Sequence, residues 1–150
     1  MASHLPSGRR IGIDYGDVRV GLAICDMDAI LVSPLETVQN DQQLFANLLR
    51  IIKEQEVLYI ALGSPKHLSG AESSKSQSIM NFGKKLSDLT GLDIYLIDER
   101  FTTKTAIGQL HDAGRDTKNS RAIIDQLAAV NILNQALVLE SSEVGLGEPL

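Results

Sequence analysis

The 150-residue sequence is poor in cysteine and aromatic residues: it has one cysteine, no tryptophan, three tyrosines and three phenylalanines. A single cysteine cannot form an intramolecular disulfide or supply a thiolate cluster for zinc. Cys25 lies in an apolar run, which favours a small buried hydrophobic residue over a nucleophile. The sequence therefore excludes a disulfide-stapled domain and a cysteine-based zinc site.

The chain also lacks long apolar runs and a strong positive charge. No unbroken apolar run approaches the roughly 18 residues of a transmembrane helix, so we expect no membrane span. The first ten residues have no apolar stretch behind their basic residues, which argues against a secretory signal and favours the cytoplasm. The formal net charge of −5 argues against a protein that coats nucleic acid by bulk electrostatics.

The charge is unevenly distributed along the chain. Residues 64–121 carry more basic than acidic side chains, whereas residues 22–63 and 140–150 are acidic. A basic surface can therefore coexist with an acidic whole, although solvated helix faces explain such a difference equally well.

Apolar periodicity predicts one α/β domain. Three β-rich runs come first, at 11–15, 18–25 and 30–38, and Pro34 makes the third an edge strand. The later segments are expected to be a helix around 44–52 capped by Asn40-Asp41, a buried strand at 57–62, a helix at 72–89 ended by Gly91, a strand at 94–97, a short helix before Gly114 and a helix at 121–139. We expect a flexible N-terminus (1–8), a domain at 9–139 and a flexible acidic tail (140–150).

The order βββαβαβα predicts a five-stranded mixed sheet with helices on both faces. Right-handed crossovers make the fourth and fifth strands parallel to the first. The carboxyl ends of these three strands then share one edge, where α/β sheets usually bind ligands.

Several acids are predicted to meet at this edge. Asp14 shares a strand face with Gly12, and a carboxylate in a central strand needs a positive partner. That partner is a metal ion or, as the structural alternative, Arg19 or Arg10. Asp98 and Glu99 end the fifth strand and should point to opposite faces, so one of them can face Asp14; solvated acids are the alternative.

Asp125 raises the same question on the last helix. It shares a face with the apolar positions that must pack on the sheet: Ala128, Ala129, Ile132 and Ala136. A first-turn aspartate stabilised by the helix dipole is the structural alternative. Three converging acids need a neutralising cation, and hard oxygen ligands select Mg²⁺ or Mn²⁺. Such ions activate water in phosphodiester hydrolysis, so the pattern points weakly to phosphoryl transfer.

Four segments in order resemble the YqgF (RuvX) family, whose members are known as Holliday junction resolvases and as nucleases that process the 5′ end of pre-16S ribosomal RNA. The resemblance covers nearly all of residues 9–139. The segments read GIDYGDVRVGLA at 12–23, GSPKHLSG at 63–70, DERFTT at 98–103 and DQLAA at 125–129. Each is weak alone, and the four in this order are highly specific.

The resemblance implies a ribonuclease H-like fold with strand order 3-2-1-4-5. It also implies that Asp14, Glu99 and Asp125 are the catalytic, metal-binding acids, with Asp98 as the substitute if the fifth strand is rotated by one residue. Resolvases of the wider superfamily place another acid at the end of the fourth strand. Residues 60–64 contain none here, which puts a second metal ion in doubt.

Basic and hydroxyl side chains near the edge are candidates for phosphate contacts, each with a surface charge or an ion pair as its alternative. They are Arg19, Lys66, Arg100, Thr102, Thr103, Lys118 and Arg121. We expect a metal-dependent nuclease acting on structured RNA, as a monomer or homodimer. A DNA-junction resolvase and a non-catalytic nucleic-acid-binding module of ribosome assembly are the alternatives.

Overall fold

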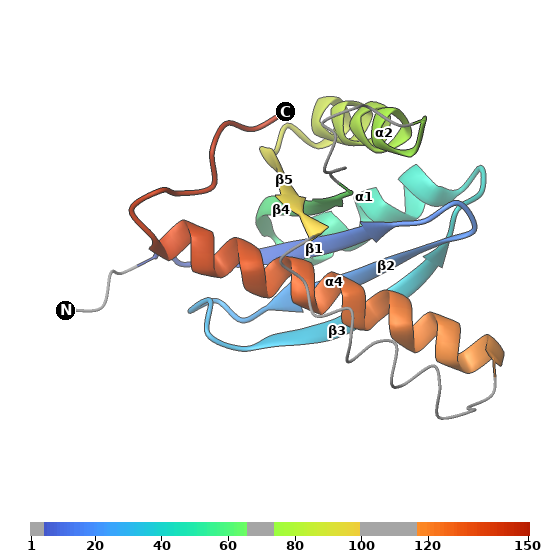
Figure 1. Ribbon diagram of the computed structural model, residues 1–150, viewed down its shortest axis with the longest axis horizontal. Coiled ribbons are helices and arrows are strands. Elements are labelled where there is room, and N and C mark those ends of the chain that lie inside the picture. Colours follow the sequence, from blue (N-terminus) through green and yellow to red (C-terminus); the bar gives the residue numbers. More distant parts are fainter. Residues whose placement is uncertain (1–4, 66–73, 100–116) are drawn as a thin grey trace.

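The computed structural model describes residues 5–65, 74–99 and 117–150, except the side chains of 117–120. Figure 1 shows a central sheet with helices on both faces. The elements are β1 (Arg9–Tyr15), β2 (Arg19–Cys25), β3 (Val32–Gln39), α1 (Leu44–Gln55), β4 (Val57–Ser64), α2 (Ser74–Thr90), β5 (Ile94–Asp98) and α4 (Thr117–Ser141). The short helix expected before Gly114 lies outside the described residues.

The sheet has the predicted order, β3-β2-β1-β4-β5. Strand β2 pairs antiparallel with both β1 and β3, whereas β4 pairs parallel with both β1 and β5. Pro34 lies on edge strand β3 opposite Ala23, and the register shifts between Leu22 and Ala23. Proline has no N–H for the ladder, which explains its place on the edge.

Two apolar layers enclose the sheet. Helices α1 and α2 cover one face, and α4 crosses the other (Figure 1). The four apolar positions that predicted α1 are all buried: Leu44, Leu48, Ile51 and Ile52. On β1, Ile11 and Ile13 face α1 and α2, and Tyr15 stacks on Phe82 with ring centroids 4.2 Å apart. The strand alternation predicted from the sequence is therefore confirmed.

Two helix starts differ from the prediction. The N-cap of α1 is Gln43, which makes no side-chain capping bond, and Asp41 instead accepts a hydrogen bond from the Gln43 N–H at 2.8 Å. Helix α4 begins at Thr117, four residues before the predicted start. The polar stretch that precedes the apolar face is itself helical, so the apolar periodicity alone placed the start too late. Gly91 ends α2 with φ +72°, as predicted.

Helix α4 packs directly on the backbone of the sheet. A Cβ atom built at Gly12 of β1 would lie 2.5 Å from the Ala129 carbonyl oxygen, and one at Gly21 of β2 would lie 2.2 Å from the Asp125 carbonyl oxygen. These distances are far shorter than a van der Waals contact. Glycine at both positions is therefore required for the approach of α4.

Residues Arg121–Ser141 of α4 are long and apolar enough, by length and composition, to cross a membrane. In the structure the apolar side of this helix forms a core cluster with the sheet, through Ile132, Leu133, Ala136 and Leu137. Polar residues such as Asp125 and Asn131 interrupt the segment. One side of this helix therefore packs in the core of the domain.

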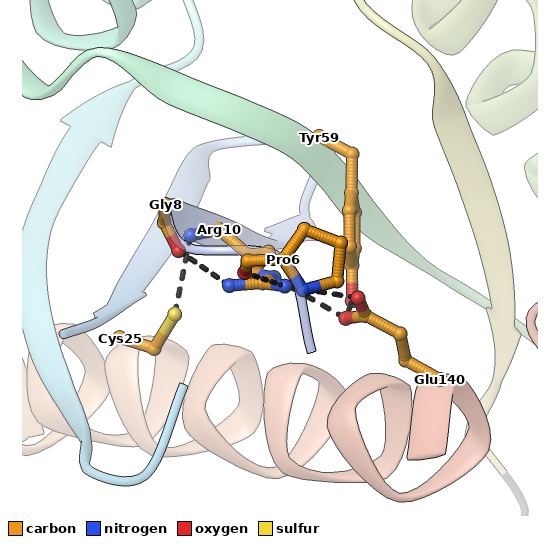
Figure 2. A network of polar contacts seen from close by, with 6 residues as sticks. All are labelled: Pro6, Gly8, Arg10, Cys25, Tyr59 and Glu140. Carbon is orange, nitrogen blue, oxygen red and sulfur yellow. Dashed lines mark hydrogen bonds and ion pairs between the residues drawn. The ribbon is translucent and has the colours of Figure 1, made fainter. Parts of the chain in front are cut away.

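A buried ion pair joins the C-terminal end of α4 to the start of β1 (Figure 2). The guanidinium of Arg10 is fully buried and contacts Glu140 through two hydrogen bonds of 3.2 and 2.9 Å. The Tyr59 hydroxyl donates to the same carboxylate at 2.7 Å, and the remaining Arg10 donors reach the carbonyls of Pro6 and Gly8. Each of the three guanidinium nitrogens of Arg10 therefore donates at least one hydrogen bond, and the buried charge is paired with a carboxylate.

The predicted small buried role of Cys25 is confirmed, since its thiol is buried and accepts a hydrogen bond from the Arg10 N–H at 3.2 Å. The C-terminal segment returns along the sheet, and the Leu150 N–H donates to the Ile94 carbonyl at 2.8 Å. Flexibility of the terminal segments in solution stays a prediction.

Substituting Gly21 with alanine should destabilise the protein by about 3 kcal/mol, because the new methyl group overlaps the Asp125 backbone and forces α4 away from the sheet. Chemical denaturation measures this loss. Gly145→Ala is the matched control, since Gly145 has φ +74° but no heavy atom near its Cβ position. The control should cost only about 1 kcal/mol of backbone strain. Equal losses in the two variants would contradict the proposed close packing.

Candidate active site

Asp14 lies near the carboxyl end of β1 on the face covered by α4. Its neighbour across the β1–β2 ladder is Gly21. Among the described residues, Arg10 pairs with Glu140 and Arg19 pairs with Asp125. The structural alternative of an ion pair between Asp14 and either arginine is therefore wrong, and another interaction must account for this buried carboxylate.

Asp125 lies over Gly21, on the side of α4 that faces the sheet. Because α4 begins at Thr117, Asp125 lies in its third turn and not in the first. The helix-dipole alternative is therefore wrong, since that effect fades within the first turn. The carboxylate Oδ2 of Asp125 instead accepts a hydrogen bond from Arg19 Nε at 2.9 Å.

Glu99 directly follows β5 and lies over Gly63 of β4. A Cβ atom at Gly63 of β4 would lie 2.9 Å from Glu99 Oε1, so this glycine leaves the space that the carboxylate occupies. Tyr95 and Ile97 of β5 pack on the α4 side of the sheet, and Glu99 continues that alternation. Glu99 thus faces Asp14, and Asp98 belongs to the other face.

The three carboxylates interact electrostatically through Asp14. Burial raises the pKa of Asp14, the negative charges of Glu99 and then Asp125 raise it further, and the combined effect brings it to about 7. A positive charge on Lys75 of α2 acts in the opposite direction. The acids predicted from three separate segments therefore meet at the shared edge of the parallel strands.

Lys75 was not predicted from the sequence. It is exposed near the start of α2, and nothing in its sequence context distinguishes it from the other helical lysines. Only the fold reveals that its ammonium group acts on Asp14.

The structure describes two of the predicted phosphate-binding side chains. Arg19 lies at the acidic edge, paired with Asp125, and Arg121 is exposed one turn earlier on α4. Lys118 belongs to α4, but its side chain is not among those described. Lys66, Arg100, Thr102 and Thr103 lie outside the described residues.

The donor set fits a hard divalent cation. Carboxylate oxygens are preferred ligands of Mg²⁺ and Mn²⁺. The pKa of Asp14 is raised first by burial and then by the negative charges of Glu99 and Asp125, and a cation would offset these charges. Within residues 5–65, 74–99 and 117–150, no set of three or more His, Cys, Asp or Glu side chains is arranged around one ion position. Strand β4 ends in Gly63-Ser64 and adds no carboxylate to the set.

Comparisons with known proteins agree with this architecture. The model of the RuvX family, described as Holliday junction resolvase, matches residues 8–138. A Cutibacterium acnes protein named "Putative pre-16S rRNA nuclease" is 39% identical over 142 residues, which cover 94% of this chain and 88% of the relative. A Streptomyces avermitilis protein of the same name is 40% identical over 136 residues, covering 89% and 87%.

Solved structures support the fold. The RuvC protein of T. thermophilus, in complex with a Holliday junction substrate, superimposes with a TM-score of 0.58 over 95% of this chain and 99% of that chain. A second structure of Thermus thermophilus RuvC gives a TM-score of 0.57 over the same shares. The sequence identities are only 14% and 17%, so the likeness establishes the ribonuclease H-like fold and no more.

The raised pKa of Asp14 predicts how stability depends on pH in metal-free buffer. The folded protein retains the Asp14 proton up to pH about 7, whereas the unfolded chain releases it around pH 3.8, so this group's contribution to stability falls as pH rises between these values. Asp14→Asn should therefore stabilise the protein by about 2 kcal/mol more at pH 8 than at pH 5. Thermal unfolding with EDTA at both pH values measures the difference.

Asp26→Asn is a control whose effect on stability at pH 8 should be opposite to that of Asp14→Asn. The Asp26 carboxylate accepts hydrogen bonds from the Ile30 and Leu31 N–H groups, and these bonds lower its pKa. Its charge therefore stabilises the fold above the unfolded pKa, and the substitution should weaken the protein at pH 8. An Asp14→Asn effect that does not change with pH would contradict the acidic cluster.

Proposed function

This chain belongs to the RuvX family, and we propose that it is a divalent-metal-dependent nuclease that cleaves at the 5′ end of precursor 16S rRNA in the bacterial cytoplasm. The observation that carries the proposal is the convergence of Asp14, Glu99 and Asp125 at one sheet edge. Relatives at 39% and 40% identity, matched over most of their length, carry the name of such a nuclease.

The three carboxylates would hold Mg²⁺ or Mn²⁺. When bound, such an ion activates water and stabilises the leaving oxygen of a phosphodiester. Asp14 contributes the buried central ligand, and its pKa of about 7 leaves a substantial fraction ionised at neutral pH. Glu99 and Asp125 approach from β5 and α4 on either side. The absence of an acid at the end of β4 favours one tightly held ion over two.

The surrounding positive charges suit a phosphate substrate. Three acids would repel a nucleic-acid backbone, and the cation offsets this repulsion together with Lys75 and Arg19. Lys75 comes from α2 and Arg19 from β2, so the two cations approach the acids from different elements. We assign to both a role in binding the phosphates that flank the cleaved bond.

Removing one acid should abolish cleavage while leaving the fold intact. Loss of groups that merely support a metal ligand commonly costs about 10- to 100-fold, so Asp14→Asn and Asp125→Asn should reduce Mn²⁺-dependent cleavage of a 5′-extended 16S rRNA transcript by at least about 100-fold. Asp88→Asn, an exposed acid of α2, is the matched control and should retain full activity. Undiminished cleavage by Asp14→Asn would eliminate the assigned mechanism.

The family description favours one second candidate, a Holliday junction resolvase acting on DNA. A four-way DNA junction offered in competition with the RNA transcript separates the two. Preferential symmetric cutting of the junction, which demands a two-fold dimer, would establish the DNA reaction in place of the RNA reaction. Retained RNA binding without any Mn²⁺ binding in calorimetry would indicate a non-catalytic binding module.

A further inference from the structure

The ion pair between Arg19 and Asp125 lies at the edge of the acidic site. Arg19 Nε is 2.9 Å from Asp125 Oδ2, and the two side chains are 26% and 21% exposed. The pair is thus open to solvent, in contrast to the fully buried Arg10 of the other pair on α4. An open pair can exchange partners at modest cost, because water stabilises both charges while they are apart.

The backbone of Asp125 cannot move with its side chain. Its carbonyl group lies against Gly21, and the neighbouring turn of α4 is held to β3 by two hydrogen bonds. The Thr37 hydroxyl donates to the Ala122 carbonyl at 3.0 Å, and the Gln126 amide donates to the Thr37 hydroxyl at 2.9 Å. Any change of partner must therefore be a rotation of the Asp125 carboxylate over a fixed helix.

Arg19 and a divalent cation require the same carboxylate. The guanidinium is permanently charged, and it lies beside Asp125, one of the acids that would hold the ion. The Asp125 oxygen bonded to Arg19 is not available to an ion while this pair is formed. Two positive charges that share a carboxylate also repel each other.

We propose that Arg19 competes with the divalent cation for Asp125 and, when displaced, turns to a phosphate of the nucleic acid. The inference rests on the proposed function and adds a regulatory contact to that site. In the cation-free protein Arg19 neutralises Asp125. In the loaded protein the freed guanidinium offers a planar pair of donors, which matches a phosphate group.

Competition of this kind couples the two ligands. The cation increases the affinity for nucleic acid by freeing Arg19, and by thermodynamic linkage nucleic acid increases the affinity for the cation equally. If Arg19 had a merely structural role, removing it would change the affinity for the cation in the opposite direction. If Arg19 instead held Asp125 in the orientation needed for the ion, removing the arginine would weaken cation binding.

Calorimetric titration with Mn²⁺ measures directly whether the loss of Arg19 strengthens or weakens cation binding. Arg19→Gln should bind Mn²⁺ about fivefold more tightly than the wild type, the upper size expected for a partly exposed ion pair. Arg19→Lys keeps the charge but loses the guanidinium geometry, so a gain of about threefold is expected. Arg50→Gln, which breaks the exposed pair with Glu54 on α1, should leave the affinity unchanged.

Unchanged or weaker Mn²⁺ binding by Arg19→Gln, with a native circular dichroism spectrum, would overturn the competition. If this variant fails to fold, Arg19→Lys still tests the direction of the change in Mn²⁺ affinity. Weaker Mn²⁺ binding by Arg19→Lys overturns the proposal. A wild type that binds no Mn²⁺ would instead overturn the proposed function itself. The two failures are therefore distinguishable.

Fluorescence anisotropy of a labelled RNA tests the coupling without cleavage. Ca²⁺, another hard cation, should strengthen RNA binding several-fold in the wild type and in Arg50→Gln. In Arg19→Gln the gain should be clearly smaller, because only the neutralisation of the acids remains. Equal strengthening in all three proteins would show that the arginine does not change partners.

Discussion

Helix α4 lies on the bare backbone of the central strands, and this contact is available only where the strands carry no side chain. Gly12 and Gly21 meet the helix backbone directly, and Gly63 leaves room for both Ile132 and Glu99. The three glycines lie on three different strands, so they align only in the folded sheet. The same approach that packs the helix also brings Asp125 to the level of Asp14, and the acidic site is thus a consequence of how α4 packs.

Two arginines of the sheet form ion pairs with α4, one with Glu140 near its C-terminal end and one with Asp125 in its third turn, and the two pairs differ in burial. Arg10 is buried, contacts Glu140 twice and has its other donors satisfied by carbonyls, so breaking it would leave an uncompensated buried charge. Arg19 is partly exposed and holds Asp125 through Nε. The first pair therefore suits a fixed structural role, and the second suits an exchangeable contact at a ligand site.

The sequence predicted the strand faces correctly, but it did not predict the ion-pair partners. Alternation along β1 correctly placed Asp14 on the face of Gly12, because that face is set by a period of two residues. The choice between Asp98 and Glu99 needed the exact end of β5 and the space over Gly63, neither of which has a sequence signal. The alternative that Arg10 or Arg19 pairs with Asp14 was wrong, since both arginines bridge to α4 across more than 100 residues.

Without a bound cation, a proton on Asp14 and the guanidinium of Arg19 offset the negative charge of the acidic edge. Asp14 keeps a proton up to about pH 7 because burial and its two acidic neighbours disfavour a third charge, and Asp125 has a guanidinium partner. A structural cluster would gain stability from apolar residues of similar volume, since desolvating these charges is costly. An acidic edge at which Asp125 has a partly exposed and replaceable positive partner is what a site that exchanges cations requires.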